Sequence, residues 1–155
     1  MNKIDTLKKY IETENFEELR AQGKQLIFWV DWREEDDAIV EYCEKCLHTD
    51  ALKAEMNYSG DDIFLTITYK DQSFKEKVID RDPTLIFLNR VLQPDYEIRF
   101  CKGSDGSDTL AFLPLSKAEW VELESIHGKE KLDRLFEIIH QETQMFSKEW
   151  DFEFE

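Results

Sequence analysis

The stretch "YEIRFCKGSDGSDTLAFLPL", residues 96–115, decides most of what the sequence says about the fold. Residues 96–101 alternate apolar and polar side chains with the two-residue period of a strand. Residues 109–115 form a second, largely apolar run. Between the two runs lie two Gly-Ser-Asp triplets, and these residue types favour tight connections. The stretch therefore predicts two antiparallel strands joined by a loop from Gly103 to Asp108.

Helices and further strands are predicted on both sides of this hairpin. Apolar spacing of three and four residues indicates helices, and β-branched or aromatic runs between turn signals indicate strands. The expected helices are 4–12, a short one between Asn15 and Gly23, 33–48, 82–93, 116–126 and 129–142. The expected strands outside the hairpin are 25–32 and a meander of 52–58, 63–69 and 74–79.

These elements predict an α+β domain with a single mixed, mainly antiparallel sheet of about six strands and helices packed on it. A chain of 155 residues fits one domain, residues 1–155. Asp82 is the expected N-cap of its helix, with Pro83 at the first helical position. Strand 25–32 is apolar on both alternating faces, so we expect it to be covered on both sides or central in its sheet.

The charge is unusual, with 35 acidic residues against 20 basic ones and a formal net charge of −15. A field of that sign repels nucleic acid and anionic membranes, and it favours encounter with a basic protein. The same charge also serves solubility alone. The three cysteines suit reduced thiols, and neither a secretory signal nor an apolar run of membrane-spanning length is present. We therefore expect a cytoplasmic protein that binds neither nucleic acid nor membrane.

The densest charge lies at residues 31–50, which hold eight acids and only two bases. Helical spacing places four of the acids on adjoining turns, away from the apolar face of helix 33–48. They are Glu34, Asp37, Glu41 and Glu44. A row of unpaired carboxylates can dock onto a basic partner, and it can equally be a solvated face. We take these four residues as the candidate partner-binding site.

The Gly103–Asp108 loop has a second interpretation as a ligand site built from Ser104, Asp105 and Asp108. A calcium loop of the EF-hand type fails, because the twelfth position counted from Asp105 is Ser116 rather than Glu. A phosphate loop would open a helix, whereas a strand follows here. A plain hairpin connection is therefore the leading interpretation.

The segment "CEKCLH" contains half of a possible zinc site in Cys43, Cys46 and His48. Four-coordinate zinc needs further ligands, and no second Cys-x-x-Cys occurs. Both thiols also lie on the apolar face of their helix, where cysteine behaves as a small hydrophobe. We expect core cysteines, no metal and no cofactor. His127 and His140 have no neighbour in a spacing that marks a catalytic triad, so no catalytic residue is assigned.

The general character of the chain, above all its acidity, resembles small cytosolic bacterial immunity proteins that neutralise toxin domains. The stretch "DYEIRFCKGSDGSDTLAFLPL" is also similar to small uncharacterised bacterial α+β proteins. The resemblance implies stoichiometric binding that blocks a basic toxin or nuclease domain. One alternative is an uncharacterised enzyme or small-ligand-binding domain with its site near Gly103–Asp108. Another is a structural or adaptor domain.

The C-terminal segment 146–155 ends in "WDFEFE", in which aromatic and acidic residues alternate. If this segment is extended, Trp150, Phe152 and Phe154 share one face. Three exposed aromatic side chains would form an unusual apolar stripe. We expect the segment to dock on the protein's own body as a last strand or flap, or else to add a strand to a partner's sheet.

Overall fold

The structure is a computed structural model that describes residues 3–22, 25–31, 33–106 and 109–146. Its helices are α1 (Lys3–Thr13), α2 (Phe16–Gln22), α3 (Asp36–Leu47), α4 (Arg81–Leu92), α5 (Lys117–His127), α6 (Lys129–Leu135) and the short 3₁₀ helix η1 (Lys102–Ser104). Its strands are β1 (Phe28–Asp31), β2 (Leu52–Ser59), β3 (Asp62–Tyr69), β4 (Gln72–Lys77), β5 (Tyr96–Cys101), β6 (Thr109–Ser116) and β7 (Phe136–Ile138).

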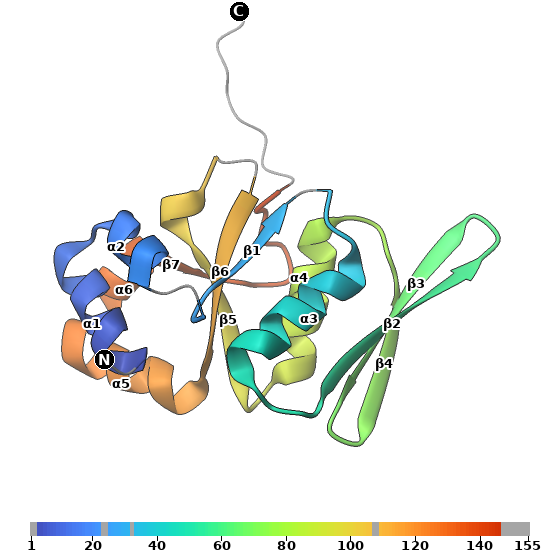
Figure 1. Cartoon of the computed structure of the whole chain (residues 1–155), viewed down its shortest axis with the longest axis horizontal. Coiled ribbons are helices and arrows are strands. Elements are labelled where there is room, and N and C mark those ends of the chain that lie inside the picture. Colours follow the sequence, from blue (N-terminus) through green and yellow to red (C-terminus); the bar gives the residue numbers. More distant parts are fainter. Residues whose placement is uncertain (1–2, 23–24, 32, 107–108, 147–155) are drawn as a thin grey trace, which may run out of the picture.

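The α+β class is confirmed, but the single six-stranded sheet is wrong. The described strands form two antiparallel sheets, one of four strands in the order β1-β6-β5-β7 and one of three in the order β2-β3-β4. Helices α3 and α4 lie between the two sheets, and α1, α2, α5 and α6 gather on the other side of the four-stranded sheet (Figure 1). The predicted meander pairs only with itself, because these two helices separate it from the hairpin.

The position of strand β6 explains why the second half of the hairpin stretch is almost continuously apolar. It lies between β1 and β5, and its apolar run faces helices on both sides. Phe112 packs in the core on the α3 and α4 side, whereas Ala111 and Leu113 pack in the core on the α1 and α5 side. A strand buried on both faces needs a near-continuous apolar sequence rather than a strict alternation. The predicted β5–β6 hairpin is confirmed by the antiparallel register that places Phe100 opposite Phe112.

The predicted last helix is too long. Helix α6 ends at Leu135, and β7 follows at once, pairing Phe136 with Cys101 and Ile138 with Arg99 of β5. Phe136 is fully buried. The helical spacing predicted a longer helix because a local pattern contains no information about the edge of β5. The backbone N–H and C=O groups along that edge need hydrogen-bond partners once they are buried, and β7 supplies them.

Two further expectations about positions need correction. The N-cap of α4 is Asp80, whose side chain accepts a hydrogen bond from the backbone N–H of Arg81. Asp82 is buried instead, and its carboxylate accepts hydrogen bonds from the backbone N–H groups of Met145 and Phe146.

Strand β1 lies at one end of its sheet and is not central. It is nevertheless covered on both faces, as one of the two expectations had it.

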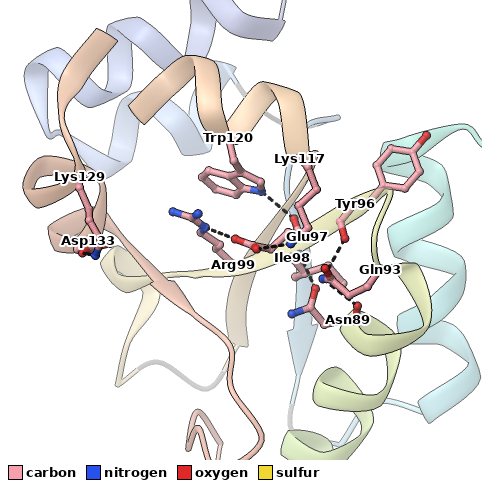
Figure 2. A network of polar contacts seen from close by, with 10 residues as sticks. All are labelled: Asn89, Gln93, Tyr96, Glu97, Ile98, Arg99, Lys117, Trp120, Lys129 and Asp133. Atoms are coloured by element: carbon pink, nitrogen blue, oxygen red, sulfur yellow. Dashed lines mark hydrogen bonds and ion pairs between the residues drawn. The ribbon is translucent and has the colours of Figure 1, made fainter. Parts of the chain in front are cut away.

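A polar network fastens α5 to the outer face of β5 (Figure 2). The Glu97 carboxylate accepts hydrogen bonds from Arg99 Nε at 2.5 Å and from Lys117 Nζ at 2.9 Å. The Arg99 guanidinium lies 4.1 Å from the ring centre of Trp120, whose indole N–H donates to the Glu97 carbonyl oxygen at 2.8 Å. Glu97 and Arg99 are nearly buried and Lys117 is partly exposed. Each of these charged groups has a partner, so we assign the network a structural role.

Candidate functional site

Helix α3 presents the predicted acidic row on a firmly packed support. Its inner face buries Ile39, Val40 and Cys43 completely against the core between the two sheets. On its outer side, Glu41 is exposed and Asp37 is partly exposed. The burial on one side and the charge on the other follow the amphipathic spacing of the sequence.

A buried ion pair fixes the first turn of α3 against the first turn of α4. Asp36 is 2% exposed, and its carboxylate lies 2.9 Å from the Arg81 guanidinium and accepts the Thr84 hydroxyl hydrogen bond. Arg81 also donates to the Glu34 carbonyl oxygen. Burial raises the pKa of Asp36 above its usual value, although Thr84 and Arg81 act in the opposite direction. The acids that surround this turn are therefore held in place by the fold.

The four residues of the predicted site have different environments. The Glu44 carboxylate accepts hydrogen bonds from the Thr49 hydroxyl and from the Asp50 backbone N–H, so it closes the turn after α3. Burial raises the pKa of Tyr42, and the nearby Glu34 carboxylate, which interacts with the Tyr42 hydroxyl, raises this pKa further.

Asp37 and Glu41 differ from these two. Within the described part of the chain, neither makes an ion pair. We call Asp37 and Glu41, together with Glu34 just before the helix, the acidic face of α3. The Asp37 and Glu41 carboxylates can accept hydrogen bonds from a cationic partner without first breaking an internal ion pair.

The Gly-Ser-Asp loop is tied into the fold. Ser104 is buried, and its hydroxyl donates to the Cys101 carbonyl oxygen and accepts from the Ala111 backbone N–H. A Cβ atom on Gly103 would come within 2.5 Å of the Phe16 ring, so only glycine lets the loop pack on α2. Asp105 is partly exposed, and Asp108 lies outside the described residues. The ligand site of Ser104, Asp105 and Asp108 stays a prediction. The Ser104 hydroxyl holds the loop to the fold through its two hydrogen bonds.

The cysteines also face the interior. Cys43 and Cys101 are fully buried, and Cys46 is partly buried with a pKa that burial raises to about 11. Over residues 3–22, 25–31, 33–106 and 109–146, no group of three or more His, Cys, Asp or Glu side chains is arranged to hold a metal ion. His48 ends α3 in the left-handed conformation. The expected core position of Cys43 is thus confirmed.

A groove of about 470 Å³ lies between β1 and the C-terminal half of α3. It is lined by Gln25, Ile27, Phe28, Trp29, Tyr42, Lys45, Cys46 and His48. The sequence contains no signal for this groove, because its two walls come from a buried strand and a helix whose relative placement the local residue pattern does not determine.

None of the described helices has both the length and the apolar character that a membrane crossing requires. Comparison of the chain with protein-family models finds no match, and comparisons with curated proteins and with solved structures find no significant similarity.

Proposed function

We propose that this protein is an acidic interaction protein, a cytosolic inhibitor of the immunity type that binds and blocks a basic toxin or nuclease domain. The acidic face of α3 is the proposed contact surface. The observation that carries the proposal is the pair Asp37 and Glu41, two carboxylates without an internal ion pair on a helix that a buried ion pair anchors.

Charge complementarity explains how such a surface would work. A chain with a formal net charge of −15 attracts a cationic domain over long range and raises the association rate. A helix already fixed by packing loses little conformational entropy when it binds. Glu44 lies at the end of the row but is engaged by Thr49 and Asp50, so we expect it to contribute less than the other three.

The test compares two triple charge reversals that alter the net charge equally. The first changes Glu34, Asp37 and Glu41 to Lys, and the control changes Glu122, Glu124 and Glu130 to Lys, all three of which are exposed on α5 and α6. The wild-type chain is used to capture a partner from host lysate at low and high salt. Association and dissociation rates with the purified partner are then measured for all three proteins.

The α3 reversal should slow association by about tenfold or more while dissociation changes less, and it should weaken the salt dependence. The control should change the association rate much less. Equal slowing by both variants would show that only net charge matters, and unchanged rates in the α3 variant would refute the proposed surface.

The alternative of a ligand-binding or catalytic domain centred on Gly103–Asp108 has less support. The Ser104 hydroxyl is fully used by backbone groups, and Gly103 is packed against Phe16. A purely structural or adaptor domain is the remaining alternative, and an acidic face that binds no basic partner would favour it.

A further inference from the structure

A small polar pocket of about 300 Å³ lies between α4 and the segment that follows β7. Spacings of three and four positions place the residues of the α4 wall on one face of the helix. They are Ile86, Asn89, Arg90 and Gln93. The opposite wall consists of Ile139, His140 and Gln141. The pocket shares no residue with the groove beside β1 or with the acidic face of α3.

Hydrogen bonds hold both walls of this pocket in place. The backbone N–H of His140 donates to Thr143 Oγ1 at 2.6 Å, and two backbone N–H groups further along the segment donate to Asp82 in the first turn of α4. On the helix, the side-chain amide of Gln93 donates to the Asn89 carbonyl oxygen at 3.3 Å. The pocket is therefore largely preformed, which lowers the entropic cost of ordering it around a ligand.

Asn89 supplies a hydrogen-bond donor that the protein does not use. This residue is only 7% exposed, and its Oδ1 atom accepts the backbone N–H of Ile98 at 2.7 Å. That bond fixes the orientation of the amide, so the Nδ2 group lies on the side away from Ile98 (Figure 2). Among the residues that the structure describes, none accepts a hydrogen bond from Nδ2. Because Asn89 is more than nine-tenths buried and lines the pocket, a ligand oxygen that accepts from this poorly hydrated donor is favoured.

The charges around the pocket favour an anion. Arg90 is the one permanently charged residue of the lining, which includes no carboxylate. The Arg90 guanidinium forms an ion pair with Glu76, but these side chains are 52% and 44% exposed. An exposed pair contributes little free energy, so the guanidinium can also bind the carboxylate of a ligand. The side chains of Ile86 and Ile139 supply an apolar surface for a short hydrocarbon group.

We propose that this pocket binds a small aliphatic carboxylate. The carboxylate group is held by Asn89 Nδ2 and the Arg90 guanidinium, and the hydrocarbon group packs against the two isoleucines. The volume lies at the lower end of the roughly 300–1,000 Å³ that is typical of ligand clefts, which suits a small acid. The site is independent of any basic protein partner, because it lies apart from the acidic face of α3.

Three ligands with the same branched hydrocarbon chain test this proposal at neutral pH. They are the anion isocaproate, its neutral amide isocaproamide and the cation of isohexylamine. Each is titrated into the isotope-labelled full chain, and the backbone and side-chain amide signals are followed by NMR. Isocaproate should bind with a dissociation constant of about 1 mM and shift the side-chain amide signals of Asn89. The amide should bind about tenfold more weakly because it lacks the charge that Arg90 recognises, and the cation should not bind.

Substitutions of exposed residues separate the pocket from the net charge of the chain. Arg90→Met should weaken isocaproate binding about tenfold and leave isocaproamide binding unchanged. Glu76→Gln, which frees the Arg90 guanidinium, should strengthen isocaproate binding about two- to fivefold. Arg134→Met is the matched control, because it removes a similarly exposed arginine that is ion-paired with Glu14. This control should leave the affinity for isocaproate unchanged.

Equal affinities of the wild-type chain for isocaproate and isocaproamide would overturn the proposal. So would a loss of affinity that is the same in Arg90→Met and Arg134→Met. Shifts confined to residues outside the pocket, or no saturable shift at about twenty times the expected dissociation constant, would overturn it as well.

Discussion

Replacing Glu97 by Gln tests the polar network that joins α5 to β5. The Glu97 and Arg99 side chains are only 14% and 9% exposed, and Arg99 depends on this carboxylate for its ion pair. Breaking a buried pair by removing one partner costs about 3–5 kcal/mol, because a charge stays buried without compensation. Gln can still accept one hydrogen bond, and Lys117 is partly exposed, so we expect a loss of about 2–3 kcal/mol. For a chain of this size, that lowers the melting temperature by roughly 4–12 °C.

The effect should depend on pH in a defined direction. Burial alone would raise the pKa of Glu97, but the hydrogen bonds from Lys117 and Arg99 outweigh it and lower the pKa. A lowered pKa means that the ionised group stabilises the fold above the unfolded value of about 4.3, and that this stability is lost as the pH falls through the folded-state pKa. The difference between wild type and Glu97→Gln should therefore be full at pH 7 and shrink below about pH 4.

Urea unfolding followed by circular dichroism, at pH 7 and at a pH below about 4, measures this difference in the free energy of unfolding. The control is Asp133→Asn, which removes an ion pair with Lys129 in the same region of the molecule (Figure 2). That pair is 2.6 Å long but largely exposed, so the control should change stability much less. Adding Arg99→Met to Glu97→Gln should recover part of the loss. Equal stability of Glu97→Gln and wild type at pH 7, or a difference that grows on acidification, would refute this reasoning.

Three further substitutions test packing and buried hydrogen bonds. Gly103→Ala should destabilise the protein by about 1–3 kcal/mol, because the new methyl group meets the Phe16 ring. In a Phe16→Ala background, where that ring is absent, the same substitution should lower the free energy of unfolding by less. Phe112→Ala should cost about 3–5 kcal/mol in urea unfolding, since this side chain is fully buried between other aromatic rings; a loss under 1 kcal/mol would contradict the packing. Asp82→Ala should cost about 2–3 kcal/mol by releasing two backbone N–H groups after β7, with faster amide exchange at Phe146 as the specific sign.

Local chemistry along the sequence predicted most individual elements. The capping box of Ser116 and Glu119 opens α5 as its spacing required, with both reciprocal hydrogen bonds formed. The meander and the hairpin also form, because turn residues and β-branched runs act over a few positions. The amphipathic pattern of α3 placed Ile39 and Cys43 inside and Glu41 outside. Each of these features depends on residues that are close together in the chain.

Contacts between distant segments decided the rest. The sequence could not show that α3 and α4 separate two sheets, or that Phe136 leaves its helix to pair with Cys101. It likewise could not show that Asp82 turns inward to hold the segment after β7, or that β1 and α3 enclose a groove. Such outcomes depend on which buried backbone and polar groups find partners once the chain is compact. That competition is settled by the whole fold, and local propensity carries no information about it.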